Sequence, residues 1–231
     1  MNINDDIRKK VVVHPRNKQW TAEHSGMCET LYLDLVDKVK PVATKLVRIS
    51  PSSILPPEMI GGGKEVLVLE GTYNDQRGEY PTGSYMRFPP GTKQEAFTDK
   101  GCLLFVKTWQ FEPTDRKRVN IDAFRAEMKR PRKRQGVVLQ QLYSDYREDV
   151  RIEHWERNHR LVIHQCNGLE VLLLSGEFFE PSASYKPLSW VRLPPGRPLK
   201  VVVGDQGVRV LIKESHLVHA VPGREAFSQT G

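Results

Sequence analysis

Three blocks of this 231-residue chain occur twice at nearly constant spacing. EVLVLEG at 65–71 returns 105 residues later as EVLLLSG at 170–176, and YMRFPPG at 85–91 returns at the same offset as WVRLPPG at 190–196. GCLLFVK at 101–107 returns one residue late, as GVRVLIK at 207–213. A period of about 100 residues is the size of a small domain. One fold has therefore been duplicated, and each copy can be compared with the other.

Short strand-like segments separated by turn residues dominate both copies, which predicts an all-β protein built from sandwiches or barrels. The predicted strands are residues 45–50, 65–70, 84–88 and 103–109 in the first copy, and 150–155, 170–179, 188–193, 200–203 and 208–213 in the second. One helix is predicted, over residues 121–129, with Asn120 as its cap and Pro131 ending it.

The repeat also predicts the domain organisation. We expect an N-terminal segment at 1–19, a first domain at 20–113, a basic linker with the short helix at 114–136, a second domain at 137–217 and a C-terminal tail at 218–231.

The positive charge is concentrated in the linker. The chain carries a net charge of +7, and residues 115–134 hold nine Lys or Arg against three acids, which is +6. A nucleic-acid interface would depend on this segment alone, and Phe124 is its only aromatic residue for base stacking. The pattern therefore favours a solvated linker over a nucleic-acid reader.

Compartment and membrane signals are few. No apolar stretch approaches the roughly 20 residues of a membrane span, and the charged first ten residues do not resemble a secretory signal. The three cysteines, Cys28, Cys102 and Cys166, are far apart and form no CxxC pair. These features predict a reduced, cytoplasmic compartment.

The repeated blocks, with the segments at 55–71, 78–91, 101–107, 189–196 and 207–217, resemble the cupin superfamily and, more narrowly, the ChrR-like cupins. Those are related to the C-terminal cupin domain of an anti-sigma factor. The resemblance covers most of residues 20–217 and implies two tandem jelly-roll (double-stranded β-helix) barrels, a bicupin. The zinc-binding module that precedes the cupin in ChrR proteins is not visible in residues 1–45, where His24 and Cys28 lack a second cysteine. We therefore do not expect an active anti-sigma factor.

The resemblance also locates the metal site of active cupins, which use two His, a Glu and a later His. In this chain the four positions hold Glu58, Ile60, Lys64 and Gln94. Only Glu58 is an ordinary ligand, and the ammonium of Lys64 would repel a cation. Because an inward charge needs a partner, Glu58, Lys64 and Gln94 are expected to form a polar cluster where the metal would otherwise lie.

The second copy has metal-ligand residue types at a misleading position. His164, Cys166 and Glu170 have suitable spacing, but the repeat offset places them one residue away from the ligand positions, and Leu199 stands at the later His. A shift of one residue turns a strand side chain to the other face, although a bulge near 167–168 could restore it. We interpret these residues as structural or surface residues.

The loss of ligand residues leads to a functional expectation. We expect a non-catalytic bicupin without a cofactor, acting as a sensing or interaction protein for a small molecule or protein partner in bacterial stress signalling. The alternative is a metal-dependent enzyme of the dioxygenase or isomerase type, with a divalent metal such as zinc, or metal-free acid–base chemistry by Glu58 and Lys64. Cupins often pair through barrel edges, so a homodimer is compatible with the resemblance.

Overall fold

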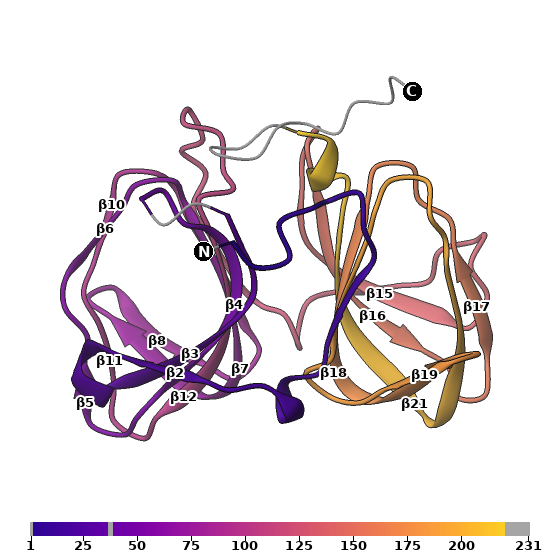
Figure 1. Ribbon diagram of the computed structural model, residues 1–231, viewed down its shortest axis with the longest axis horizontal. Coiled ribbons are helices and arrows are strands. Elements are labelled where there is room, and N and C mark those ends of the chain that lie inside the picture. The colour runs from indigo at the N-terminus through magenta and orange to yellow at the C-terminus, as the bar shows by residue number, and fades with distance from the viewer. Residues whose placement is uncertain (1, 37–38, 220–231) are drawn as a thin grey trace. The chain divides into compact units, whose positions relative to one another are not determined.

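The computed structural model describes residues 2–36 and 39–219 as two compact all-β units. The first barrel contains Lys18–Phe124 with residues 2–5, and the second barrel contains Asp6–Asn17 and residues 125–219 (Figure 1). Most of the expected C-terminal tail, from residue 220 onward, lies outside the described residues. No helix in the described part of the chain is long and apolar enough to cross a bilayer.

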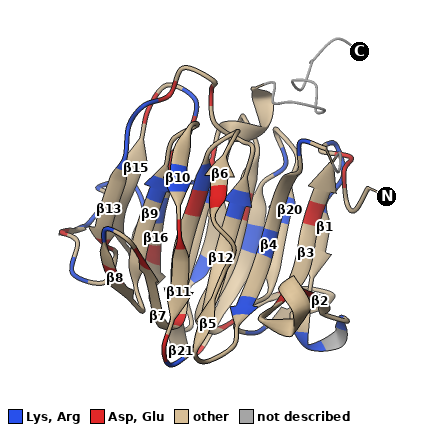
Figure 2. Cartoon of the chain, turned by 90° about the vertical axis from the view of Figure 1, so that its left-hand side faces the viewer, with Lys and Arg blue, Asp and Glu red and all other residues tan. Residues whose placement is uncertain are grey.

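The first barrel is a ten-stranded sheet closed by a two-stranded ribbon. The main path of the sheet runs β13 (Val119–Asp122), β9 (Ser84–Phe88), β7 (Lys64–Asp75), β12 (Cys102–Thr108), β4 (Val42–Ile49), β3 (Cys28–Val36) and β2 (Thr21–Glu23). Three short strands join it through β7 or each other: β5 (Ser53–Ile54), β8 (Gly78–Pro81) and β11 (Ala96–Thr98). The ribbon pairs β6 (Glu58–Ile60) with β10 (Thr92–Gln94), on the face of this barrel that Figure 2 turns toward the viewer.

The second barrel repeats this arrangement. Its sheet runs β1 (Val11–Val13), β20 (Trp190–Leu193), β18 (Leu169–Glu180), β21 (Leu199–Glu214), β16 (Asp149–Trp155), β15 (Val137–Ser144) and β14 (Met128–Lys129). Two more strands, β17 (Arg160–Ile163) and β19 (Ala183–Tyr185), pair with β21 and β18. The two cupin-like barrels expected from the repeat are therefore present. The only helices in the described residues are three-residue 3-10 turns: η1 (Pro15–Asn17), η2 (His24–Gly26) and η3 (His216–Val218).

The expected helix over 121–129 is wrong. Val119–Asp122 instead form β13, in antiparallel register with β9, and Met128–Lys129 form β14 against β15. The Asn120 side chain was expected to cap a helix, but β-branched Val119 and Ile121 favour the strand. The ladder continues beyond β13 because the Ala123 N–H donates to the Gly83 carbonyl at 2.8 Å. Tertiary pairing thus overrides the local helix signal.

Each barrel is completed by a strand that precedes the other copy of the repeat. β1 lies ahead of the first copy but pairs with β20, where Val11 faces Arg192. β13 lies ahead of the second copy but pairs with β9, where Val119 faces Arg87. Since Arg87 and Arg192 are equivalent across the repeat, β1 and β13 occupy equivalent places. In Figure 1 the indigo start of the chain runs beside the orange and yellow strands accordingly.

The two repeated arginines are buried and bind the segments that lead into the exchanged strands. Arg87 is buried, lies 3.5 Å from a Glu65 carboxylate oxygen, and donates to Asp115, just ahead of β13, at 3.3 Å. Arg192 is also buried and donates to the Asp6 carbonyl, ahead of β1, at 3.0 Å. These contacts give the repeated arginine a structural role in both barrels.

The glycine that ends the repeated EVLVLEG and EVLLLSG motifs is required by space as well as by backbone conformation. Gly71 and Gly176 have φ of +75° and +80°. A Cβ would lie 2.1 Å from the Gly101 carbonyl oxygen at the first position and 1.9 Å from the Gly207 carbonyl oxygen at the second. Glycine alone allows both the left-handed conformation and this close approach of two chains.

Candidate ligand site

The first barrel contains a cavity of about 470 Å³, which is within the usual range of small-molecule sites. Its walls are mostly apolar, with side chains from β4, β7 and β12 such as Val47, Val66, Leu104 and Val106. Alternating residues of these strands point inward, so the apolar positions form the walls and the polar positions in the lining stand out. The polar and ionisable lining residues are Glu23, His24, Cys28, Thr30, Lys45, Glu58, Lys64, Tyr73, Gln94 and Thr108.

Glu58, Lys64 and Gln94 meet on one wall of the cavity. The Lys64 ammonium forms an ion pair with the Glu58 carboxylate and donates to Gln94 Oε1 at 3.1 Å. Glu58 and Gln94 are opposite each other in the β6–β10 ribbon, which explains why they converge. The Gln94 amide group reaches on to Asp75 at 3.5 Å, and Asp75 also accepts from the Tyr80 hydroxyl at 3.0 Å. The expected polar cluster is therefore formed and extends inward.

The fourth expected position behaves differently. Ile60 is 2% exposed and packs in the apolar core with Val66 and Phe88, and it is not among the residues that line the cavity. Three of the four positions thus face the cavity, and the fourth supports the wall behind it.

The second barrel holds apolar residues at the three cluster positions. The repeat offset of 105 places Ile163, Leu169 and Leu199 where the first barrel has Glu58, Lys64 and Gln94. Ile163 and Leu199 are register partners, as Glu58 and Gln94 are. All three are buried and belong to the core of the second barrel.

Aromatic rings complete the filling of the second barrel. Phe178 stacks on Tyr185 with ring centroids 4.5 Å apart and lies 5.6 Å from the ring of Trp155. Phe178 is equivalent to Tyr73, which borders the cavity of the first barrel. The duplicated fold therefore has one barrel with a polar cluster on the wall of a cavity and one with apolar side chains packed at the equivalent positions.

Lys45 brings a second amine to the cavity. It is half-buried on β4, with its Nζ 5.6 Å from the centre of the Tyr32 ring. Burial lowers the pKa of Lys45, and the charge of Lys64 lowers it further, while Glu23 and Glu58 act in the opposite direction. A lysine whose charged form is disfavoured is a better nucleophile near neutral pH than an ordinary one.

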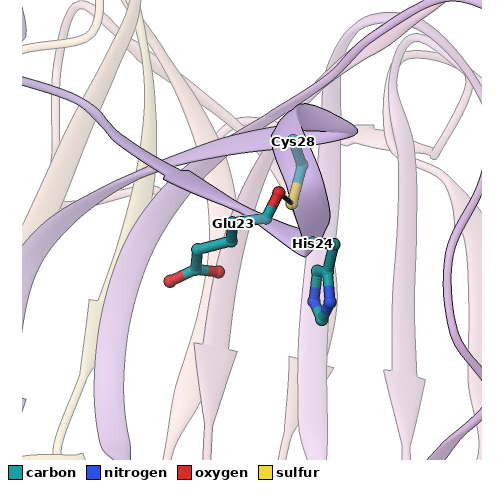
Figure 3. A group of neighbouring side chains, drawn as sticks. All are labelled: Glu23, His24 and Cys28. Carbon is teal, nitrogen blue, oxygen red and sulfur yellow. Dashed lines mark hydrogen bonds between the residues drawn. The ribbon is translucent and has the colours of Figure 1, made fainter.

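Glu23, His24 and Cys28 gather at the turn between β2 and β3, and all three border the cavity (Figure 3). Their donor atoms, one from each side chain, all lie within 4.8 Å of one another. Burial raises the pKa of the Cys28 thiol, and the nearby Glu23 carboxylate raises it further. His24 and Cys28 stand out in the sequence as possible ligands, but Glu23 does not, because nothing in the residue order shows how this turn bends.

The His164, Cys166 and Glu170 triplet of the second copy does not assemble. His164 and Cys166 are exposed, whereas Glu170 is buried and accepts a hydrogen bond from His216 Nε2 at 2.7 Å. Gln165 holds the loop by donating to the Pro194 and Arg197 carbonyls. Within the described residues, the turn at Glu23 is the one group of at least three potential metal-ligand side chains.

The fold and cavity agree with a comparison of family models. Residues 8–112 match the model of the ChrR cupin-like domain. This part of the chain is therefore similar to a ChrR cupin-like domain. The match begins ahead of β1 and ends after β12, so it takes in the exchanged strand as well as the cavity walls. Among curated proteins, none matches the sequence.

Solved structures extend the cupin-like fold to both barrels. A protein from Nostoc punctiforme, described as a suggested dioxygenase, has a TM-score of 0.75 at 11% identity, over 96% of this chain and 88% of its own. Protein Ylba from E. coli has a TM-score of 0.68 at 14% identity, over 91% and 93%. A mutant of Bacillus subtilis oxalate decarboxylase has a TM-score of 0.60 at 11% identity, over 89% and 77%. At these identities the likeness concerns the fold alone.

Proposed function

We propose that this ChrR-like bicupin is a non-catalytic sensing or interaction protein whose first barrel binds a small organic molecule. The observation that carries the proposal is the difference between the two barrels at equivalent positions. The first has Glu58, Lys64 and Gln94 around a cavity of about 470 Å³, and the second has buried Ile163, Leu169 and Leu199. A polar cluster beside a cavity costs desolvation energy that an apolar core avoids, so its presence favours a binding role.

The lining indicates the chemistry of the ligand. Valine and leucine side chains would contact an apolar body, while the amines of Lys45 and Lys64 can donate to oxygen atoms and Glu58 can accept from a hydroxyl or amine. We therefore propose a small molecule with an apolar body and one oxygen-rich polar head. The basic linker does not enter this proposal, and nucleic acid and membrane are not proposed as partners. The fold is compatible with a homodimer.

The non-catalytic part of the proposal depends on Lys64. Its ammonium stands where active cupins have a carboxylate ligand, and it is already paired with Glu58. A cation at that point would have to displace the ammonium from its partner. We propose that the first barrel does not use the metal site of active cupins and needs no cofactor there.

Ligand binding can be tested by thermal unfolding of the full chain with a library of small carboxylic acids, ketones and alcohols. Compounds that bind should raise the Tm of the natural protein. They should have no effect on the triple variant Glu58→Ile, Lys64→Leu, Gln94→Leu, which copies the second barrel. The exposed-site variant Cys166→Ser is the control and should respond like the natural protein. Stabilisation of the triple variant by the same compounds would overturn the proposed site.

The alternative of a metal-dependent enzyme is tested by metal analysis. Similar folds include a protein named as an oxalate decarboxylase, so the alternative has a specific form. Zinc, iron and manganese should be measured in the Cys28→Ser variant, which leaves Glu58, Lys64 and Gln94 intact. We expect less than stoichiometric metal. Stoichiometric metal that is lost on Glu58→Gln would contradict the proposal and establish a metal site at the cupin position.

A further inference from the structure

The turn between β2 and β3 brings together three donor types that sequence alone leaves unconnected. Glu23 ends β2, His24 opens η2, and Cys28 begins β3. His24 and Ser25 have φ of 50° and 55°, and Gly26 follows at 86°, so three successive left-handed residues reverse the chain within one short turn. Figure 3 shows the three side chains grouped there, with the Cys28 sulfur against the Glu23 backbone carbonyl.

The Glu23 carboxylate is held by side chains of the neighbouring strand. Thr30 Oγ1 donates to one carboxylate oxygen at 3.0 Å, and the Tyr32 hydroxyl donates to the other at 3.1 Å. Cys28, Thr30 and Tyr32 are alternate residues of β3 and therefore share one face of the strand. This is the arrangement by which outer hydrogen bonds orient a ligating carboxylate in protein metal sites.

We propose that Glu23, His24 and Cys28 form a binding site for a divalent metal ion of the zinc class, where this turn borders the cavity. A carboxylate oxygen, an imidazole nitrogen and a thiolate sulfur are a donor set that zinc accepts. Tetrahedral bonds of about 2.0–2.3 Å place ligand atoms roughly 3.4–3.8 Å apart. The three donors, now within 4.8 Å, need to approach by about 1 Å, which the exposed His24 side chain can provide by rotation.

The charges and surroundings fit three protein ligands and one open position. A carboxylate and a thiolate together neutralise a divalent cation, and all three residues border the cavity, so a fourth ligand would come from the cavity side. This site shares no residue with Glu58, Ile60, Lys64 and Gln94. It is independent of the proposed function, which rests on Glu58, Lys64 and Gln94.

Lys45 lies near the site and opposes a cation. Its amine also borders the cavity and interacts electrostatically with both Glu23 and Cys28. Removing its charge while keeping its length should therefore strengthen metal binding. This gives a test in which a substitution outside the ligand set increases affinity, which a purely structural role of the turn does not predict.

The experiment is a titration of the reduced, metal-free full chain with Co²⁺, a spectroscopic substitute for zinc, followed by competition with Zn²⁺. The natural protein should develop thiolate-to-cobalt charge-transfer absorption in the near ultraviolet. Cys102→Ser and Cys166→Ser should keep it, and Cys28→Ser should lose it. His24→Ala, at an exposed position, should weaken binding by more than about 10-fold, and Tyr32→Phe by roughly 10-fold. Lys45→Met should tighten it.

Two results would overturn the site. One is the lack of thiolate absorption in the folded natural protein at millimolar Co²⁺. The other is absorption that survives Cys28→Ser or disappears with Cys166→Ser, which would place the metal elsewhere. Circular dichroism of each variant shows whether it folds, and His24→Ala decides the outcome if Cys28→Ser does not fold. Lys64→Met alters the proposed ligand cavity but none of the proposed metal ligands, so it should leave the cobalt spectrum unchanged. Failure of the metal site can therefore be distinguished from failure of the proposed ligand cavity.

Discussion

Leu199 occupies in the second barrel the position that Gln94 occupies in the first. Gln94 is the register partner of Glu58, and Leu199 is the register partner of Ile163. The strand pairing is thus equivalent at both places, while one pair is polar and the other apolar. The difference at these positions therefore lies in the side chains and not in the pairing.

Replacing the polar cluster with its second-barrel counterparts should stabilise the protein. We expect the triple variant Glu58→Ile, Lys64→Leu, Gln94→Leu to raise the free energy of unfolding by about 1–4 kcal/mol, because a partly buried ion pair is exchanged for apolar packing. Urea unfolding measures this. Lys64→Leu alone is the matched control and should lower stability, since it leaves Glu58 and Gln94 without their shared donor. A triple variant less stable than the natural chain would show that the cluster itself stabilises the barrel.

Two glycines with the same backbone conformation should differ in their tolerance of alanine. Gly176 and Gly196 have φ of +80° and +78°, but a Cβ at Gly176 meets the Gly207 carbonyl oxygen at 1.9 Å, whereas at Gly196 nothing lies within 4 Å. Gly196→Ala should cost about 1–2 kcal/mol for the left-handed conformation alone. Gly176→Ala should cost about 1–3 kcal/mol more because the chains must move apart. Equal losses in chemical unfolding would mean that the close approach is not maintained in solution.

Stability should fall in alkaline solution. Burial raises the pKa of Cys102 to about 12 and, with help from Glu23, the pKa of Tyr32 to about 12. Both groups release a proton in the unfolded chain at lower pH than in the folded protein. Their contribution is therefore complete below the unfolded pKa and is lost as pH rises through about 9 to 12. Urea unfolding between pH 8 and 11 should show this decline. The slope should be smaller in Cys102→Ala, and an unchanged slope would exclude the thiol as a contributor.

Arg134 should be structural although it belongs to the basic linker. Its guanidinium donates to Glu153, which is fully buried, with a 2.7 Å bond to Oε2. Burial opposes the charge of Glu153, but Arg134 and Arg151 outweigh it and lower its pKa. Arg134→Ala should destabilise the second barrel by about 1.5–3 kcal/mol, the usual value of a hydrogen bond to a charged group. The exposed neighbour Arg132 is the control, and Arg132→Ala should stay within about 0.5 kcal/mol. Similar losses for the two variants in thermal or urea unfolding would contradict this role.

The fold could be predicted from the sequence because the repeat places equivalent residues at equivalent points. The resemblance to cupins located the metal-site positions, and the need of an inward charge for a partner then predicted the meeting of Glu58, Lys64 and Gln94. The helix over 121–129 could not be excluded, since its cap and length were acceptable locally and only pairing with β9 decides the strand. Strand partners depend on distant residues, and neither β1 nor β13 reveals in its own sequence which barrel it completes.

The candidate metal site escaped prediction for a different reason. In this turn His24 and Ser25 have left-handed backbone, a conformation that cannot be predicted from these residue types. The spacing of His24 and Cys28 would suggest a helix face. The structure instead places Glu23 beside them by reversing the chain. A search of the sequence for carboxylates next to His and Cys at hairpin turns could have found it.

The exchange of β1 and β13 makes the two halves of the gene product mutually dependent. A fragment ending at residue 113 would keep β1 but lose β13, and a fragment beginning at residue 114 would have the reverse defect. Each would expose an open sheet edge on β9 or β20 and carry a spare strand suited to the other half. The fragments, mixed, are therefore expected to complement each other in trans. A single ancestral copy with this connectivity would have completed its barrel by pairing with the equivalent strand of a second copy.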